Sequence, residues 1–202
     1  MPITIESLQT QIPYYLTKEA KEGLTKALSD FPCNINYYIE RYQEEILQGD
    51  GWTSLEIIGF ESGERKAIKG IILSNSCDIS SENMRDLPIK ITFAPIVRLN
   101  LYVELLEKSG LNQQNISGKI DAIKEQKVTS LFYLPKGARL DEDYIALLDD
   151  LYTVPFTAFQ KRTNRVKLFT LSQVGFYLFL FKLSIHFCRF HENIPRSEAG
   201  II

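Results

Sequence analysis

Hydrophobic residues after residue 48 fall into short runs that are rich in β-branched and aromatic side chains and are separated by Gly, Pro and Ser. Runs of this length, bounded by residues typical of turns, predict strands. Five strands are predicted: 52–60 (WTSLEIIGF), 66–74 (KAIKGIILS), 88–97 (PIKITFAPIV), 127–135 (KVTSLFYLP) and 144–155 (YIALLDDLYTVP).

A different pattern occupies the first quarter of the chain and the region between the third and fourth predicted strands. Residues 17–29 and 37–47 are rich in helix formers, which predicts an N-terminal helical segment over 1–47. Apolar residues also recur at helical spacing between the third and fourth strands, which predicts a helical insertion at about 99–126.

The most apolar stretch of the chain, residues 168–190, predicts a final helix over 171–191 that begins at Thr170 or Ser172. Polar residues such as Lys182 and His186 interrupt the stretch before it reaches the roughly 18–20 apolar residues that a membrane span needs. We therefore expect a buried helix and no membrane association.

Consecutive short strands with helices only in an insertion and at the ends favour a mainly β, α+β fold, namely a small and mostly antiparallel barrel. The length of 202 residues suits one domain over 1–202, with the barrel at 48–170.

The net charge of −2 and the pI near 5.8 argue against nucleic-acid binding through bulk charge, although a small basic patch stays compatible with them. Cys33, Cys77 and Cys188 are odd in number and widely spaced, and the chain does not begin like a signal peptide. These features predict reduced thiols and a cytoplasmic location.

The stretch ILSNSCDIS, residues 71–79, places a thiol and a carboxylate at the end of a predicted strand. If the strand alternates regularly, Cys77 points into the core with Ile71, while Asp78 lies on a polar face with Ser74 and Ser76. A buried thiol behaves as a small hydrophobe, with a reactive thiol as the alternative. Asp78 is either an acid/base or the cap of an Asx turn.

Asp149 and Asp150 are adjacent on the last predicted strand, so they project to opposite faces. A carboxylate among leucines requires a partner unless it is solvated, and Arg98, Lys69 and Arg165 are the candidate partners of Asp149.

His186, Cys188, His191 and Cys77 form a conceivable zinc set, but His186 and Cys188 do not share a helix face. We therefore expect no metal and no cofactor.

Residues 159–167 (FQKRTNRVK) hold the basic residues Lys161, Arg162, Arg165 and Lys167 next to Phe159. Cations beside an aromatic ring are suited to gripping a phosphate backbone and stacking on a base. The alternative is an ordinary solvated surface.

Residues 48–74, 91–97 and 144–154 resemble the PemK/MazF-like toxins, in the Gly-Asp before the first strand, the strand that ends in Leu-Ser, and the strand with Pro-Ile. The resemblance covers roughly 48–98 and 128–185. It implies an SH3-like barrel, metal-free cleavage of single-stranded RNA, and pairing into homodimers.

A second resemblance, to bacterial proteins without an assigned reaction, is closer. It comprises an LSxxCDI strand end, an Ala-Pro strand and a late helix with an arginine. The matching residues are Ser74, Cys77, Asp78, Ala94, Pro95, Leu171, Ser172 and Arg189.

The chain departs from the toxin pattern at two positions that carry chemistry. Ile68, flanked by Lys66 and Lys69, stands where the toxins have a basic residue, and Ile96 and Val97 replace a hydroxyl. Metal-free RNA cleavage needs an acid/base pair and cationic stabilisation, so these departures weigh against it.

Two functions follow as hypotheses. The first is a binding or regulatory module, in a bacterial toxin–antitoxin or phage-defence system, that contacts protein or RNA. The alternative is an enzyme. It is either a divergent metal-free endoribonuclease that uses Asp78 or Asp149 with Lys66, Lys69 or Arg98, or a hydrolase that depends on Cys77.

Overall fold

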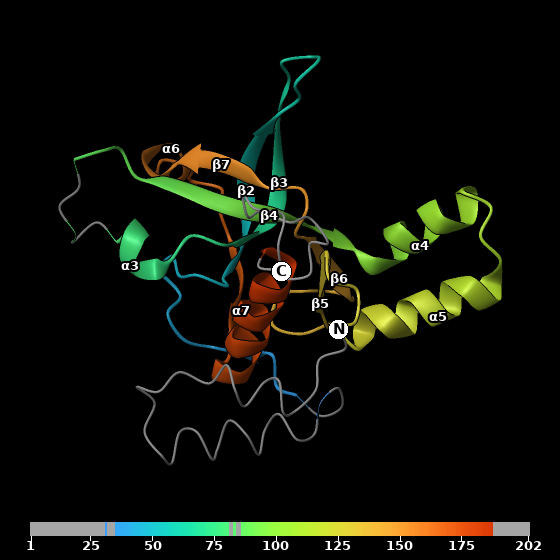
Figure 1. Ribbon diagram of the computed structural model, residues 1–202. Coiled ribbons are helices and arrows are strands. Elements are labelled where there is room, and N and C mark those ends of the chain that lie inside the picture. The colour runs from blue at the N-terminus through green and yellow to red at the C-terminus, as the bar shows by residue number, and fades with distance from the viewer. Residues whose placement is uncertain (1–30, 32–34, 81–82, 84–85, 188–202) are drawn as a thin grey trace, which may run out of the picture.

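The computed structural model describes residues 31, 35–80, 83 and 86–187, which form eight strands and five helices (Figure 1). The strands are β1 (Tyr38–Ile39), β2 (Gly51–Ile58), β3 (Arg65–Ile72), β4 (Lys90–Arg98), β5 (Leu131–Leu134), β6 (Tyr144–Leu147), β7 (Tyr152–Pro155) and β8 (Lys167–Leu171). The helices are α3 (Ser76–Ile79), α4 (Leu99–Lys108), α5 (Gln113–Lys124), α6 (Phe156–Gln160) and α7 (Gln173–Phe187).

All strands belong to one antiparallel sheet of order β1-β8-β2-β3-β4-β6-β5, and β7 pairs with β4 beyond the end of β6. The α+β class and the five predicted strand regions are confirmed, but the last region is divided into β6 and β7 by a turn at 148–151. The insertion is confirmed as α4 and α5, which lie side by side and project from the sheet (Figure 1). The pattern did not predict β1 and β8.

The sheet is open, with β1 and β5 as its edges. Side chains nevertheless connect these edges: the Tyr38 hydroxyl donates a hydrogen bond of 2.7 Å to the Pro135 carbonyl, and the rings of Tyr37 and Phe132 lie 6.4 Å apart. A hollow of about 690 Å³ separates β1 from residues 135–138. The edges are therefore bridged by side chains and not by a strand ladder.

The helix predicted at 37–47 is wrong. Tyr38 and Ile39 instead pair with Thr170 and Leu171 of β8, and the residues that follow have no regular structure. Pairing with a strand more than a hundred residues away outweighs local helix propensity, which is only a weak preference. The predicted helix at 17–29 lies outside the described residues.

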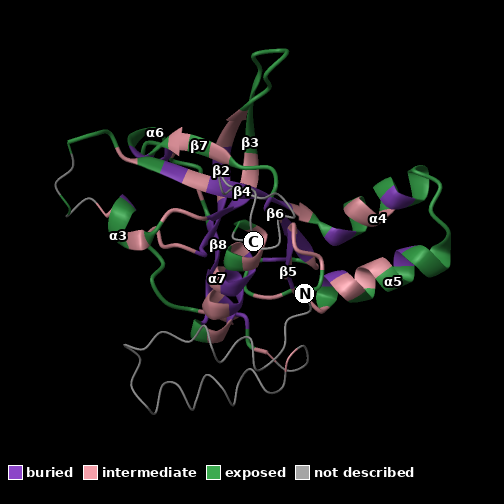
Figure 2. Cartoon of the chain, viewed as in Figure 1, coloured by how far each residue is buried: buried purple, intermediate pink, exposed green. Residues whose placement is uncertain are grey.

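Both faces of the sheet are covered, as the central band of buried residues in Figure 2 shows. Ile71 faces a core with Phe179 of α7, whereas its neighbour Ile72 faces a second core with Phe156 and Phe159 of α6. Because neighbouring strand residues point to opposite faces, two cores explain why Ile71 and Ile72 are both fully buried.

The final helix confirms the prediction that Ser172 lies at its start. The Ser172 hydroxyl accepts a hydrogen bond of 3.1 Å from the Gly175 N–H and donates one of 2.5 Å to the Asn36 carbonyl. Residues 188–191 of the predicted helix lie outside the described part of the chain. Among the described residues, no helix has both the length and the apolar character that a membrane crossing requires.

Gly175 gives a direct test of how closely α7 approaches β1. A Cβ atom at this position would lie 2.6 Å from the Tyr37 carbonyl oxygen, which is a backbone atom and cannot rotate away. We expect Gly175→Ala to lower the free energy of unfolding by about 2 kcal/mol, measured by urea denaturation. Gly118 of α5 has open space around it, so Gly118→Ala should instead stabilise the protein by about 0.5–1 kcal/mol.

Candidate functional site

The segment after β3 does not continue as a strand, so the predicted orientation of Cys77 is wrong. β3 ends at Ile72, and the Asn75 side chain accepts a hydrogen bond from the Cys77 N–H, which starts the short helix α3. Cys77 is exposed there and is not a core residue. The helical turn replaces the expected two-residue alternation, and Ile79 becomes the residue that enters the core.

Asp78 is exposed on α3 and does not share a row with Ser74 and Ser76. Both serines hold the surrounding backbone: Ser74 Oγ accepts from the Thr92 N–H at 2.8 Å, and Ser76 Oγ accepts from the Gln48 N–H at 2.9 Å. The hydroxyls therefore fix the segment in place and do not form a catalytic row with Asp78.

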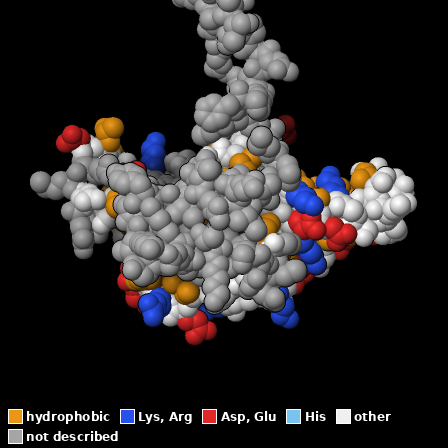
Figure 3. All heavy atoms as spheres, turned by 60° about the horizontal axis from the view of Figure 1, so that its bottom comes forward, with side chains coloured by type: hydrophobic (Ala, Val, Ile, Leu, Met, Phe, Trp, Pro, Cys, Tyr) orange, Lys and Arg blue, Asp and Glu red, His pale blue; other side chains and the backbone are white. Residues whose placement is uncertain are grey.

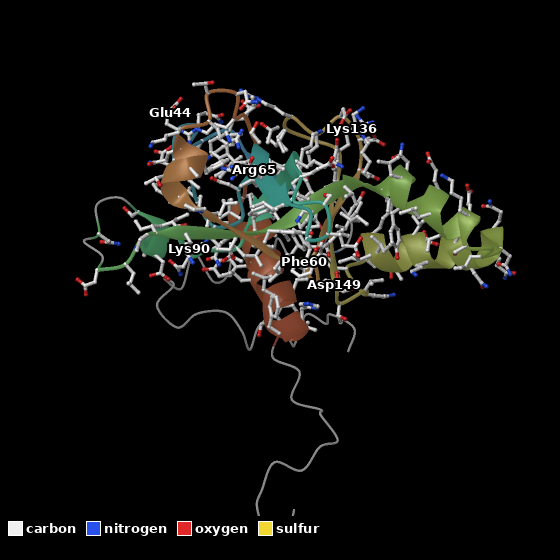
Figure 4. All side chains as sticks on the ribbon, turned by 90° about the horizontal axis from the view of Figure 1, so that it is seen from above. Glu44, Phe60, Arg65, Lys90, Lys136 and Asp149 are labelled. Atoms are coloured by element: carbon white, nitrogen blue, oxygen red, sulfur yellow. The ribbon has the colours of Figure 1, made fainter. Side chains whose placement is uncertain are left out.

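Asp149 lies in the turn between β6 and β7 and is exposed, so the strand position predicted for it is wrong. In Figure 4 it lies away from Arg65 and Lys136, two of the basic side chains labelled there. Its proposed partners are engaged elsewhere: Arg98 with acidic residues after β5, Lys69 with Tyr144, and Arg165 with aromatic rings. The turn lets the carboxylate reach water, which removes the need for a buried partner.

The basic group at 159–167 does not form an exposed stacking surface. Phe159 is buried and packs edge-on against Trp52 at 5.7 Å, and the Arg165 guanidinium lies 5.5 Å from both rings. Lys167 is buried and forms a 2.7 Å ion pair with Asp50. Lys161 is exposed, and Arg162 is half-buried and forms an ion pair of 2.7 Å with Glu56.

Asp50 is fully buried at the start of β2. Burial raises the pKa of its carboxyl group, while the hydrogen bond and charge of Lys167 and the Leu47 N–H oppose that rise. The Lys167 ammonium also lies 5.2 Å from the centre of the Trp52 ring. This pair holds the residues before β2 against β8.

Two of the predicted phosphate-binding residues, Lys69 and Arg98, come together at Tyr144. Arg98 of β4 lies opposite Tyr144 of β6 in the ladder. The Tyr144 hydroxyl accepts from Lys69 Nζ at 2.7 Å and donates to Asp141 at 3.0 Å. Arg98 pairs with Asp141 at 3.1 Å and with Glu142 at 2.8 Å. We call these five residues the Tyr144 cluster.

The Tyr144 cluster is balanced in charge, with two cations and two carboxylates. The Tyr144 hydrogen bond and the charge of Arg98 lower the pKa of Asp141, and the Tyr144 hydrogen bond and both carboxylates raise the pKa of Arg98. Asp141 and Arg98 therefore stay ionised near neutral pH, a state that suits binding better than proton transfer.

A groove of about 440 Å³ lies between β2 and β7. It is lined by consecutive residues of both strands, 56–58 and 152–155. Since neighbouring residues project to opposite faces, a sheet face would contribute only every second residue. The groove therefore follows the edges of the two strands, where backbone groups are accessible.

Three charged side chains line this groove, which we call the β2–β7 groove. Glu56 pairs with Arg162 at 2.7 Å and lies 3.9 Å from Arg65. Two cations share one carboxylate, so the lining carries a net positive charge. Ile57, Ile58 and Val154 add apolar surface.

The sequence reasoning identified Arg162 but missed Arg65, Glu56 and Tyr144. Pro155 is the signal that could have located the groove, because proline within a sheet is confined to edges and bulges. The remaining predicted residue, Lys66, is exposed on β3 opposite Ile57 and does not line the groove.

A metal centre receives no support from the described residues, among which no three His, Cys, Asp or Glu side chains are placed to hold an ion. Cys188 and His191 lie outside the described residues.

Comparisons with known proteins leave the family open: no protein-family model matches the sequence, and no curated protein matches it.

Proposed function

We propose that this protein is a binding module that holds a segment of a partner protein in the β2–β7 groove. The observation that carries the proposal is that two strand edges, apolar side chains and a net positive charge line the same hollow. Backbone edges offer hydrogen bonds to a second chain, and the side chains around them supply specificity.

The placement of the predicted catalytic residues favours binding over catalysis. Cys77 and Asp78 lie on α3, which follows β3, whereas Asp149 lies in the turn that leads into β7, and β3 and β7 pair with opposite sides of β4 (Figure 1). A catalytic site requires groups that converge on one reacting atom.

The electrostatics favour a protein partner over RNA. Binding through phosphates needs cations that carboxylates do not already neutralise. Several of the described cations have such partners, as in the pairs Arg98–Glu142, Arg162–Glu56 and Lys167–Asp50. In the view of Figure 3, the visible basic and acidic side chains also lie beside one another.

Site-specific photocrosslinking in the native cells tests this function. A photoreactive amino acid at Ile58, which is exposed and lines the groove, should yield a discrete crosslink to one protein. The same amino acid at Leu101, an exposed apolar residue of α4 outside the groove, is the matched control. Equal crosslinking at both positions, or none at Ile58, would contradict the proposal.

Endoribonuclease activity is the second candidate, because the Tyr144 cluster places Lys69 and Arg98 around one hydroxyl. These cations could stabilise a phosphorane and Tyr144 could transfer a proton. If this activity exists, Tyr144→Phe should lower the cleavage rate of single-stranded RNA about 100-fold. No cleavage by the wild-type chain would exclude this candidate and leave the binding module.

The proposal also covers the detailed fold type and the biological system in which the protein acts. We regard the bridged, open sheet as a variant of the SH3-like barrel, because the Tyr38–Pro135 hydrogen bond and the Tyr37–Phe132 contact bring its edges together. A role in a toxin–antitoxin or phage-defence system, and pairing of two copies, stay predictions from the resemblance.

A further inference from the structure

We infer that the occupant of the β2–β7 groove is an extended peptide with an acidic side chain, which adds to the sheet as a further strand along the edge of β7. This inference rests on the proposed function and specifies the chemistry of its partner. It depends on which backbone groups face the groove and on the charges beside them.

Thr153 supplies the backbone groups on the β7 side. The Thr92 carbonyl accepts from the Leu73 N–H, and the Thr92 N–H donates to Ser74, so both backbone groups of Thr92 point toward the β3 side of β4. Thr92 is paired with Thr153 across the ladder. In an antiparallel ladder, two residues that lie opposite each other either both point their backbone N–H and carbonyl toward each other or both point them away. The Thr153 N–H and carbonyl therefore point away from β4, into the groove.

Glu56 and Ile58 supply the backbone groups on the β2 side. The Gly59 N–H donates to the Glu64 carbonyl, so Gly59 bonds across the β2–β3 hairpin. Along an antiparallel strand, every second residue hydrogen-bonds to the same neighbouring strand. Ile57 lies two residues before Gly59 and opposite Lys66, so it also hydrogen-bonds to β3. The backbone groups of Glu56 and Ile58 consequently face the groove.

Part of β2 lies within 8 Å of β7, but neither facing edge is paired in a ladder with another strand in the described part of the chain. There, β7 pairs with β4 alone, and residues 55–58 of β2 pair with β3 alone. Pro155, which cannot donate to a ladder, ends β7 and limits a new strand to the neighbourhood of Thr153. An added strand would therefore be short and fixed in register.

The charges select an acidic occupant. Arg162 holds Glu56 at 2.7 Å, but Arg65 lies 3.9 Å from the same carboxylate, beyond the length of a good hydrogen bond. The Arg65 guanidinium therefore keeps donors for a second carboxylate, for which an arginine fork is well suited. Glu56 would repel that carboxylate, so removing its charge should strengthen binding.

A selection from random peptides of about twelve residues, displayed and incubated with the full chain, provides the probes. We expect enriched peptides to carry Asp or Glu between β-branched or aromatic residues, and to slow hydrogen exchange at the Thr153 N–H. Arg65→Gln should weaken their binding about 10-fold, whereas Glu56→Gln should strengthen it. Misfolding cannot produce these opposite changes. Lys124→Gln, which removes an ion-paired cation outside the groove, should leave the affinity unchanged.

Three results would overturn the inference: enriched peptides without an acidic residue, equal binding to Arg65→Gln, or unchanged exchange at Thr153. A groove that binds single-stranded oligouridylate in place of peptides would overturn it as well. The photocrosslink at Ile58 distinguishes failure of this inference from failure of the proposed function. If the crosslink persists while the peptide tests fail, a partner protein still binds in the groove and only the inference of an acidic added strand is wrong. If it is also lost, the proposed function fails with it.

Discussion

Lys167→Met is expected to lower the free energy of unfolding by about 3–5 kcal/mol, because it leaves the buried Asp50 carboxylate without its counter-charge. Both side chains are almost completely buried, with exposed fractions of 3% and 0%. The change also removes hydrogen bonds from the Lys167 ammonium to the Tyr42 carbonyl and to Thr170. Urea denaturation at pH 7 measures the loss.

The double variant Asp50→Asn/Lys167→Met distinguishes an unpaired charge from lost packing. It removes the carboxylate together with its partner, and should recover at least half of the loss. Lys127, whose ion pair with Glu125 is half exposed, is the matched control, and Lys127→Met should change stability by less than about 1 kcal/mol. A Lys167→Met protein as stable as the wild type would contradict the burial of this pair.

Lys182→Met is expected to make the stability of the protein less dependent on pH. Lys182 belongs to α7 and is buried, with an exposed fraction of 1%, and its ammonium donates to the Gln126 carbonyl. Burial lowers the pKa of Lys182 from 10.5 to about 7.

The direction follows from proton binding. Between pH 7 and 10.5 the unfolded chain holds a proton on Lys182 that the folded chain has released, so folding becomes more favourable as pH rises. Below pH 7 the folded protein must bury the charge. The shift corresponds to a difference on the order of 4–5 kcal/mol across this window.

The measurement compares urea denaturation of wild type and variant at pH 6 and at pH 9.5. Lys182→Met should be the more stable protein at pH 6, and its advantage should shrink toward pH 9.5. Lys108→Met, at an exposed position of α4, should show no such trend. A pH-independent difference at Lys182 would mean that its pKa is the same in the folded and unfolded chains, which would contradict the burial of the amine.

The strand regions could be predicted from the sequence because they depend on residue patterns within short segments. β-branched and aromatic runs between turn residues located β2, β3, β4, β5 and the β6–β7 region, and helical spacing located α4 and α5. β8 was missed because its residues, 167–171, run directly into the apolar pattern of α7. β1 was missed because its two residues become a strand only through pairing with β8.

The site was less predictable, since exposure depends on what packs against a residue. Phe159 lies beside basic residues in the sequence, yet it is buried under Trp52 and Arg165. Cys77 follows an alternating strand, yet the Asn75 side chain turns the backbone into a helix before the alternation reaches it. Arg98 and Lys69 were both candidates and meet at the Tyr144 hydroxyl, but the carboxylates that neutralise Arg98 come from residues 141 and 142 after β5.

The α+β class, the helical insertion and the buried final helix could be predicted, since these follow from periodicity within single segments. The open sheet, the surface position of Cys77 on α3 and the groove between β2 and β7 become visible in the folded chain alone. Those features depend on which distant strands pair and which edges remain unpaired. Local hydrophobic patterns do not contain that information, because the free energy that selects a pairing arises from contacts between segments far apart in the chain.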